Sequence, residues 1–547
     1  MNDALVGAAR EWSAQDPDEE TRAELNALIV DAQSGSPGAQ AELEDRFSAR
    51  LEFGTAGLRG AIGAGPNRMN RVLVTQAAAG LAAFLLSRET SPSVVIGYDG
   101  RKNSRVFALD TAEILAGAGV TATLLPRLLP TPVLAYAVRH LDASAGVMVT
   151  ASHNPAADNG YKVYLGGADA GSQIVPPSDG EIAARILEVA AGDIRELPRS
   201  DGYTTAGEDV LDDYVAATSS LGRAKAKLRV VYTAMHGVGW ETARRVFLDA
   251  GFDEPVVVTE QLQPDPDFPT VAFPNPEEPG ALDLAFARAA EVGADLVVAN
   301  DPDADRLAVG VPDGTGWRRM SGNEVGLLLG WRAAERSTDG TLACSIVSSP
   351  GLATIAEVSG LRHVETLTGF KWISRAPNLV FGFEEALGYL VDPDVLRDKD
   401  GISAAVDMLT LVSELKAEGK TLGDHADDFA ARFGAFSSSQ ISLRFTDLPE
   451  IPRIMNRIRA TPPTEIGGAK VASIDDFENG FGEFPPGDIL RIWTSDGARI
   501  VVRPSGTEPK LKVYIDASSS TGNARERRAT ADAIVATLDA GMRDLLA

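Results

Sequence analysis

Cysteine is nearly missing from this chain of 547 residues. Its single cysteine is Cys344, so an intrachain disulfide is excluded and a reducing compartment is expected. The N-terminal residues are acidic and lack the basic and then apolar pattern of a secretory signal. We therefore expect a cytoplasmic protein.

Long hydrophobic runs and an excess of basic charge are missing too. The most apolar short stretch, residues 77–86, has about half the length that a membrane span needs. The chain has 51 Lys and Arg against 77 Asp and Glu, a formal net charge of −26. So acidic a chain repels nucleic acid and anionic membranes. If the ligand is nonetheless an anion, its binding cations must be concentrated in one cleft.

Several well-known catalytic motifs are absent from the sequence. Residues 419–421, Gly-Lys-Thr, resemble the end of a P-loop, but Glu414 stands where that motif needs glycine. Ser152 has no G-x-S-x-G around it, which argues against a hydrolase nucleophile elbow. There is no Cys–His metal set and no dinucleotide fingerprint, so nucleotide-driven transfer is not supported.

What the sequence does contain is an alternation of short β-branched runs with longer stretches rich in Ala, Leu and Glu, which indicates α/β layers. The C-terminal part instead has four strand-like runs, beginning with 441–445, and a closing helix over 530–546. We expect three α/β domains and a smaller α+β domain, with breaks near 222–227, 312–322 and 433–441. The clearest strands are expected over 94–99, 145–151, 228–235, 294–300 and 490–496, and the clearest helices over 21–32 and 402–419.

The strongest chemical signal is the motif NDPDADR, in which Asp301, Asp303 and Asp305 alternate. In an extended segment these three carboxylates would project to one side. Crowded carboxylates need a hard cation, and oxygen-only ligands favour Mg²⁺ or Ca²⁺. An EF-hand is excluded, because Arg306 and Pro312 stand where its glycine and glutamate belong. An acidic surface turn is the alternative, but the neighbouring arginine is suited to orienting an anion.

A second signal is TASHNP, which follows the apolar run AGVMV. Pro155 biases Asn154 towards extended backbone, so the motif predicts a short, stiff turn that presents Ser152 at a strand end. Strand ends are where α/β proteins place their chemistry. The alternative is a polar turn that has no functional role.

A third signal is RPSGTEPKLKVY, a cationic loop between two strand-like runs. Arginine offers a fork for a phosphate, hydroxyls add donors, and glycine lets backbone amides approach an anion. In so acidic a protein, this concentration of positive charge favours an anion-binding loop over an ordinary hairpin turn. Its candidate groups are Arg503, Ser505, Gly506 and Thr507, with Lys510 and Lys512 at the exit.

Three weaker motifs complete the set. EFGTAGLRG places Arg59 after a flexible turn. TLTGFKWI places Lys371 among aromatic residues, where desolvation would lower its pKa and suit it to moving a proton. GFEEALGYL offers Glu384 and Glu385 as acceptors for sugar hydroxyls.

Taken in order, EFGTAGLRG, TASHNP, DPDADR, TGFKW, GFEE and RPSGTEPK resemble the α-D-phosphohexomutase family over almost the whole chain. Within it, the chain resembles the phosphoglucomutase/phosphomannomutase branch, which carries a helical extension before its first domain. The resemblance implies an α/β fold of three related α/β domains and a C-terminal α+β domain around a central cleft. The implied domains are residues 1–224 (helical extension and phosphoserine domain), 225–320 (metal-binding), 321–440 (sugar-binding) and 441–547 (phosphate-binding).

The resemblance also implies a role for each motif. Ser152 would be phosphorylated in the resting enzyme, and its phosphate oxygen would join Asp301, Asp303 and Asp305 as ligands of Mg²⁺. The catalytic residues would be Ser152, His153, Arg59, Lys162 and Arg306, with Lys371 as a candidate proton shuttle. The substrate-binding residues would be Glu384 and Glu385 for the sugar, and Arg503, Ser505, Gly506, Thr507 and Lys512 for the non-reacting phosphate.

The expected reaction interconverts hexose 1-phosphate and hexose 6-phosphate, glucose first and mannose second, through a hexose 1,6-bisphosphate. Ala386 stands where the family's sugar loop usually has serine, so one hydroxyl contact to the sugar is lost or supplied elsewhere. A phosphopentomutase of the same family is the alternative. A metal-dependent sugar phosphatase and a non-catalytic sugar-phosphate sensor are further alternatives. We expect a monomer or homodimer.

Overall fold

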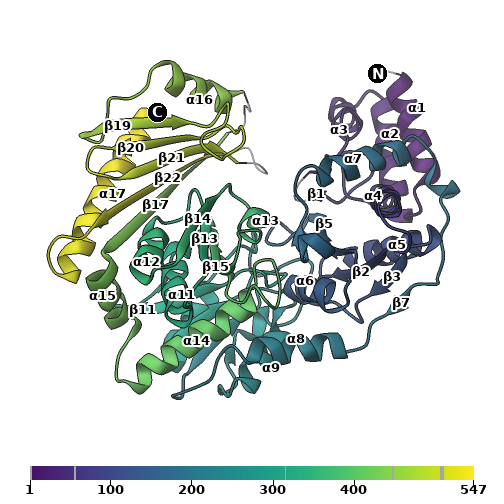
Figure 1. Ribbon diagram of the computed structural model, residues 1–547. Helices are drawn as coiled ribbons and strands as arrows, with labels where there is room; N and C mark the ends of the chain where they lie inside the picture. The colour runs from purple at the N-terminus through teal and green to yellow at the C-terminus, as the bar shows by residue number, and fades with distance from the viewer. Residues whose placement is uncertain are drawn as a thin grey trace. The chain divides into compact units, whose positions relative to one another are not determined.

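The computed structural model describes residues 3–54, 57–314, 316–445, 447, 449–505 and 510–546 (Figure 1). The chain divides into two compact units. Unit 1 comprises Met1–Met320 and Gly388–Ser413, and unit 2 comprises Ser321–Leu387 and Glu414–Ala547.

Unit 1 begins with the helical extension that the family resemblance implied. The helices are α1 (Asp3–Gln15), α2 (Glu19–Gln33) and α3 (Pro37–Phe47). The Asp18 carboxylate accepts a hydrogen bond from the Glu20 amide, which satisfies an orphan donor at the start of α2. Trp12, Leu25 and other apolar side chains of the three helices pack into a common buried cluster. The helix expected over 21–32 is therefore confirmed within α2.

The first sheet of unit 1 has the strand order β1-β5-β4-β2-β3-β7, with β6 paired to β5. Strands β4, β2, β3 and β7 run parallel, whereas β5 is antiparallel to β4 and to β1. The strands are β1 (Leu58–Ala61), β2 (Ser93–Tyr98), β3 (Thr121–Leu124), β4 (Ala145–Val149), β5 (Asp158–Leu165), β6 (Ser172–Gln173) and β7 (Thr204–Thr205). The helices are α4 (Arg71–Leu86), α5 (Ser104–Gly117), α6 (Thr131–His140) and α7 (Ser178–Ala190).

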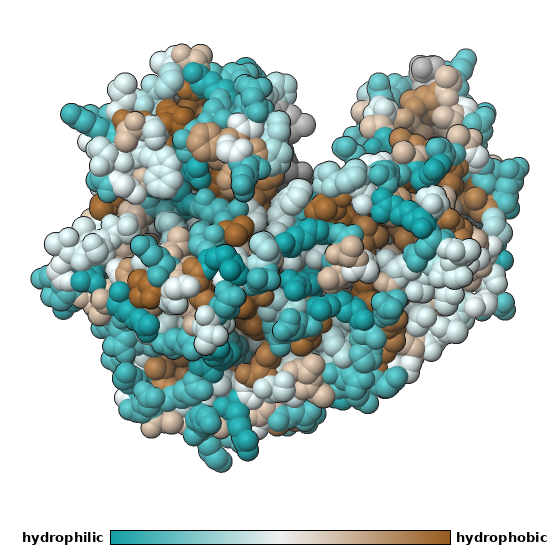
Figure 2. Space-filling model, viewed as in Figure 1, coloured by the Kyte–Doolittle hydropathy of each residue, from teal (hydrophilic) through white to brown (hydrophobic). Residues whose placement is uncertain are grey.

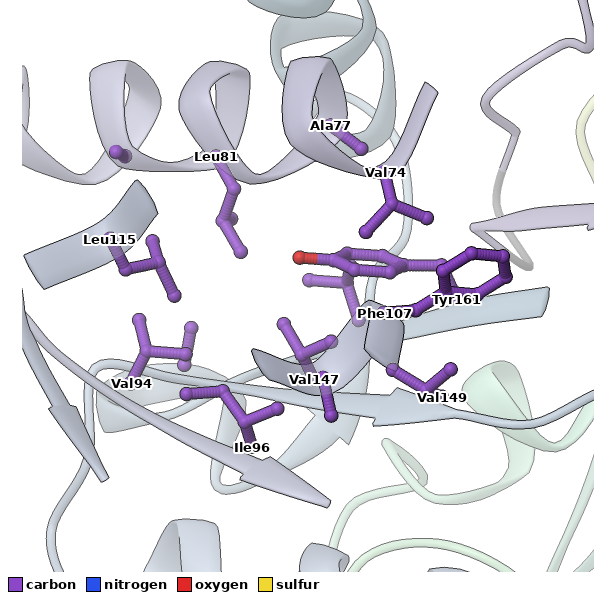
Figure 3. Close-up of a cluster of buried hydrophobic side chains, with 14 of the residues drawn as sticks. Val74, Ala77, Leu81, Val94, Ile96, Phe107, Leu115, Val147, Val149 and Tyr161 are labelled. Carbon is purple, nitrogen blue, oxygen red and sulfur yellow. The ribbon is translucent and has the colours of Figure 1, made fainter. Parts of the chain in front are cut away.

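The core of this part lies between α4 and the sheet. Figure 3 shows side chains of α4 facing those of β2 and β4: Val74, Ala77, Leu81, Val94, Ile96, Val147 and Val149. The apolar run before TASHNP is β4, a central strand whose residues are all buried. Because burying one large aliphatic side chain contributes about 1.5–3 kcal/mol relative to leaving it exposed, this strand anchors the loop that follows it.

The second sheet of unit 1 repeats this arrangement in the order β12-β11-β10-β8-β9. Strands β9, β8 and β10 are parallel, and β11 is antiparallel to β10. The strands are β8 (Val230–Thr233), β9 (Val256–Val257), β10 (Leu296–Ala299), β11 (Ala308–Asp313) and β12 (Gly316–Arg319). The helices are α8 (Asp209–Ser219), α9 (Gly239–Asp249) and α10 (Asp283–Val292). In both sheets a loop therefore joins a parallel strand to an antiparallel neighbour, β4 to β5 and β10 to β11.

Unit 2 opens with the parallel strands β14, β13 and β15, in that order. They are β13 (Thr341–Ser345), β14 (Arg362–Thr366) and β15 (Leu379–Glu384). The helices of this part are α11 (Gly322–Arg336), α12 (Gly351–Ser359), α13 (Phe370–Ile373) and α15 (Leu422–Phe433). A capping box starts α11, in which Ser321 and Glu324 each accept a hydrogen bond from the other's amide.

The C-terminal part of unit 2 is an antiparallel sheet with the order β17-β22-β21-β20-β19-β18. Helices α16 and α17 share a buried core with it. The elements are β17 (Ala435–Arg444), α16 (Glu450–Ala460), β18 (Glu465–Ile466), β19 (Ala469–Asp476), β20 (Leu490–Thr494), β21 (Arg499–Pro504), β22 (Lys510–Ser519) and α17 (Ala524–Leu546). The strand-rich set closed by a helix is confirmed. Strand β17 begins earlier than expected, because it pairs with β22 along its whole length.

The expected α/β class is thus confirmed, and the five clearest predicted strands correspond to β2, β4, β8, β10 and β20.

Among the described residues, every helix is too short or too polar to span a membrane. On the face that Figure 2 shows, hydrophobic residues are interspersed with hydrophilic ones.

Unit 1 also contains β16 (Gly388–Leu390) and the start of α14 (Gly401–Ala417). Asp400 caps this helix by accepting hydrogen bonds from the amides of Ile402 and Ser403, at 2.9 and 3.1 Å. The Tyr214 hydroxyl donates to the same carboxylate at 3.0 Å. Burial nevertheless raises the pKa of Asp400 to about 6.

An Asp400→Asn variant should be stabilised relative to wild type as the pH rises. The folded protein holds the Asp400 proton up to about pH 6, whereas the unfolded chain releases it near pH 4. The carboxyl therefore favours the folded state in acid, and that contribution is lost as the pH rises through its folded pKa. The unfolding free energy of wild type, relative to the variant, should fall by up to about 3 kcal/mol between about pH 4 and pH 7. Urea unfolding of both proteins across this range checks it, and a pH-independent difference contradicts it.

Candidate active site

Ser152 lies on the turn between β4 and β5, as the sequence predicts. Its backbone is left-handed, with φ +52°. The Ser152 amide donates to the Thr150 hydroxyl at 2.8 Å, and the Asn154 amide donates to the Ala151 carbonyl at 3.0 Å. Only 3% of Ser152 is exposed. The serine is therefore held on a tight, hydrogen-bonded turn at the end of a buried strand.

The Ser152 hydroxyl reaches the acidic motif although 149 residues separate them. Its Oγ donates to Asp301 Oδ2 at 3.1 Å, and it lies 3.1 Å from His153 Nδ1. Two motifs found independently in the sequence thus meet at one oxygen atom.

Asp301, Asp303 and Asp305 are fully buried, with carboxylate oxygens within 4.8 Å of one another. The expectation of an extended segment is wrong. The segment turns, with Ala304 at φ +57° and its amide bonded to the Asp301 carbonyl at 2.8 Å. The carboxylates converge because the backbone folds back on itself, and the Arg306 amide fastens the turn by donating to Asp301 Oδ1 at 3.0 Å.

The three acids fit a divalent cation. Oδ1 of Asp303 and Oδ1 of Asp305 are buried without a hydrogen-bond partner among the described residues. Buried polar atoms of this kind are rare unless an ion or water satisfies them. The donor set is oxygen only, which suits Mg²⁺.

Lysines surround the acids. Lys162 Nζ, on β5, donates to Asp303 Oδ2 at 2.7 Å and to Asp305 Oδ2 at 2.9 Å. Lys399 Nζ lies 3.4 Å from Asp305 Oδ2. Burial acts to raise the pKa of Asp305, but Lys162, Lys399 and Arg306 outweigh it and hold that pKa far below its usual range. Burial and the two neighbouring carboxylates raise the pKa of Asp301 well above its usual value.

The other predicted residues of unit 1 lie around the same turn. Arg59, on β1, donates to Asn154 Oδ1 at 3.2 Å. Arg306 NH1 lies 3.6 Å from Glu277 Oε2. Burial, together with the charges of Arg306 and Arg59, lowers the pKa of His153 well below its ordinary value. His153 is therefore neutral at neutral pH and offers one N–H donor.

Three polar neighbours of the site escaped sequence reasoning. Thr131, at the start of α6, donates its hydroxyl to Asp303 Oδ2 at 2.7 Å and its amide to the Asp303 carbonyl. Lys399 belongs to a run of alternating charges, RDKDG, which was a usable signal for a buried ion pair. Arg101, which donates to the Ser152 carbonyl, carries no signal beyond its place after β2.

The predicted sugar loop and Lys371 lie in unit 2. Glu384 ends β15, and the Glu385 carboxylate accepts hydrogen bonds from Ser345 at 3.1 Å and Ser348 at 3.0 Å. Lys371 lies on the short helix α13, with Nζ 5.8 Å from the centre of the Trp372 ring. This lysine therefore lies near one aromatic ring, and its expected role in moving a proton stays a prediction.

The predicted phosphate loop is the hairpin between β21 and β22, also in unit 2. Arg503 and Lys512 are directly paired across these strands, so their side chains share one face of the sheet. The Ser505 amide donates to the Lys510 carbonyl at 2.7 Å. Gly506 and Thr507 lie outside the described residues.

A buried arginine links these two regions of unit 2. Arg499 NH2 lies 2.7 Å from Asp516 Oδ2, and its NH1 lies 3.1 Å from Glu365 Oε1. Its NH2 also donates to the carbonyl of Ser348, the residue whose hydroxyl holds Glu385. The sugar loop is thereby tied to β21, which carries Arg503 at its end.

Comparison with known proteins matches the chain to the four domains of the phosphoglucomutase/phosphomannomutase family. The α/β/α domains I, II and III match residues 50–192, 212–314 and 321–433, and the C-terminal domain matches 452–533. A protein of Haemophilus influenzae named probable phosphomannomutase is 56% identical over 482 residues, covering 87% of this chain and 98% of that protein.

Two further relatives are more distant. A human phosphopentomutase is 35% identical over 569 residues, covering 94% of this chain and 91% of that protein. A crystal structure of a phosphoglucomutase/phosphomannomutase family protein from Burkholderia thailandensis has a TM-score of 0.69 at 20% identity, covering 91% of this chain and 97% of that one. This last likeness concerns the fold alone.

An Asp303→Asn variant should bind Mg²⁺ at least about tenfold more weakly, because it loses one anionic ligand of three. Asp313→Asn is the matched control, since Asp313 is exposed at the end of β11. Ligands that bind the folded state raise the melting temperature. Mg²⁺ should therefore raise the melting temperature of wild type and of the control more than that of Asp303→Asn, and calorimetric titration should give the affinities. Equal Mg²⁺ affinity in all three proteins contradicts a metal site at the triad.

Proposed function

This chain belongs to the phosphoglucomutase/phosphomannomutase family and is a sugar-phosphate mutase, and we propose that it interconverts hexose 1-phosphate and hexose 6-phosphate through a phosphorylated Ser152. The proposal is carried by the 3.1 Å distance between Ser152 Oγ and Asp301 Oδ2, at the edge of a buried set of three acids. A phosphate on this serine would add an oxygen ligand to that set.

In the proposed reaction, the bond between phosphorus and Ser152 Oγ breaks as a bond forms to the free hydroxyl of a sugar monophosphate. The sugar hydroxyl loses its proton, and the serine oxygen gains one. The resulting bisphosphate turns over, and its other phosphate returns to Ser152 by the same step in reverse. Lys371 is the candidate that moves the proton at the sugar, by virtue of its position beside Trp372.

The metal would be held by Asp301, Asp303, Asp305 and an oxygen of the serine phosphate. Mg²⁺ at such a site supplies positive charge that stabilises the transferring phosphoryl group. Lys162, Arg306 and Arg59 supply further positive charge, and neutral His153 donates a hydrogen bond without adding charge. We propose that these four residues orient the phosphoryl oxygens.

The substrate would be held by the groups of unit 2. Glu384 and Glu385 would accept hydrogen bonds from sugar hydroxyls, and Ser345 and Ser348 fix the orientation of Glu385. The phosphate that does not react would bind at the hairpin between β21 and β22. The residues proposed for it are Arg503, Ser505, Gly506, Thr507 and Lys512.

We propose glucose and mannose phosphates as substrates. The Haemophilus relative, with 56% sequence identity, is named probable phosphomannomutase, whereas the human relative, with 35% identity, is named phosphopentomutase. Ala386 lacks the hydroxyl that the family's sugar loop usually offers, so this loop does not indicate which sugar is preferred. The domain ranges 1–224, 225–320, 321–440 and 441–547, the cytoplasmic location, and the monomeric or homodimeric state remain predictions.

Ser152→Ala should abolish isomerisation of glucose 1-phosphate, because no oxygen remains to carry the phosphoryl group. Ser220→Ala is the control, since Ser220 is exposed at the end of α8. Intact-mass measurement after incubation with glucose 1,6-bisphosphate should show one added phosphate on wild type and on the control, and none on Ser152→Ala. Full activity of Ser152→Ala would refute the role of this serine.

A substrate panel tests the sugar. Glucose, mannose, glucosamine and ribose 1-phosphates, each primed with its bisphosphate, should give the highest kcat/KM for glucose and mannose. A clear preference for ribose would establish the pentose alternative. Steady release of inorganic phosphate faster than isomerisation would instead identify a phosphatase.

A further inference from the structure

Arg101 lies between β2 and α5, outside every motif that the sequence analysis singled out. Only 4% of it is exposed, so its guanidinium is enclosed by the protein. Burying a guanidinium costs free energy unless most of its donors are hydrogen-bonded or ion-paired, so the partners of Arg101 indicate its role.

Those partners are backbone carbonyls of the turn that carries Ser152. NH2 donates to the Ser152 and Asn154 carbonyls, both at 2.6 Å. NH1 donates to the Pro155 carbonyl at 2.8 Å and to the Asp158 carbonyl at 3.2 Å. One side chain thus binds four carbonyls between the serine and the start of β5.

The guanidinium is itself held in place by two neighbours. Asp99 Oδ2 lies 3.5 Å from Nε, and Oδ1 of the same carboxylate accepts from the Arg101 amide and from the Ser104 hydroxyl. The ring of Phe268 lies across the guanidinium, with its centre 4.9 Å from Cζ. These two contacts restrain the planar guanidinium, although Nε itself makes no hydrogen bond among the described residues.

The hydrogen bonds from Arg101 to these four carbonyls oppose a strain in the backbone of Ser152. A left-handed backbone costs a residue other than glycine about 1–2 kcal/mol, and Ser152 has φ +52°. Strain of this kind persists only where surrounding contacts outweigh it. Rotation of the Ser152 backbone would turn its carbonyl away from Arg101 and move Oγ away from Asp301.

We propose that Arg101 is a positioning residue, which holds Ser152 in the left-handed conformation that places Oγ beside the acidic triad. The inference rests on the proposed role of Ser152 as the phosphate carrier. NH1 and NH2 are each already bonded to two carbonyls of the turn, and the side chain is buried, so its loss should act through the position of Ser152. We therefore expect a lower kcat and an unchanged KM for the sugar phosphate.

The test compares Arg101→Met and Arg101→Lys with Arg105→Met, a control at an exposed arginine of α5. Misplacement of a reacting group by about 1 Å can cost on the order of 100-fold in rate. We expect kcat to fall by about that factor in Arg101→Met and less in Arg101→Lys, whose single nitrogen cannot span four carbonyls. The KM should stay within about twofold, and added guanidinium ion should restore part of kcat in an Arg101→Ala protein.

Thr150→Val is a second, independent variant, because it removes the hydroxyl that accepts from the Ser152 amide. If both side chains hold the same conformation, the effects of Thr150→Val and Arg101→Lys on kcat should be non-additive. A folded Arg101→Met with wild-type kcat overturns the proposal, as does a rise in KM at unchanged kcat. An Arg101→Lys protein that does not fold also overturns it, because Arg101 would then serve folding in general.

The same experiment separates this inference from the proposed function. Wild type is incubated with glucose 1,6-bisphosphate and its mass is measured. If wild type takes up no phosphate at Ser152, the proposed function fails whatever the variants do. If wild type is phosphorylated and the Arg101 variants keep full kcat, the positioning role alone fails.

Discussion

Repulsion among three buried carboxylates is the constraint on which the rest of unit 1 depends. Charges placed within 4.8 Å of one another and away from water interact strongly, so the triad requires cations. Lys162 comes from β5, next to the serine turn, and Lys399 comes from the segment before α14. Each lysine reaches the acids only when its own element is packed against the acidic turn. The charge balance of the site is therefore complete only in the folded unit.

The serine turn and the acidic turn occupy equivalent places in two related sheets. Each follows a parallel strand and precedes its antiparallel neighbour, β4 to β5 and β10 to β11. Each contains one non-glycine residue with a left-handed backbone, Ser152 and Ala304. The strain is opposed by Arg101 in the first turn and by hydrogen bonds to Asp301 in the second. A strained turn at a strand end is thus used twice, once for the serine and once for the acids.

Much of the fold could be predicted from sequence, because its signals are local. Apolar runs bounded by polar turns marked β4 and β10, and the cationic loop was correctly placed between β21 and β22. The three acids do converge, as their alternation predicts, but the physical cause differs, because the backbone turns at Ala304 instead of running as an extended strand. Arg101 and Thr131 could not be found, because hydrogen bonds to backbone carbonyls and to a carboxylate on another sheet leave no local pattern.

The sequence by itself determined the order of the elements, the apolar strands that would be buried, and which short motifs had the atoms for phosphate and metal chemistry. Propensity, periodicity and side-chain chemistry act over a few residues and can be read directly from the chain. Tertiary structure brings Ser152 to Asp301, a contact that only the family resemblance implied, and it alone decided that Lys399 balances the charge of Asp305. These contacts join residues far apart in the chain, and their energies depend on distance and burial, which exist only after the chain has folded.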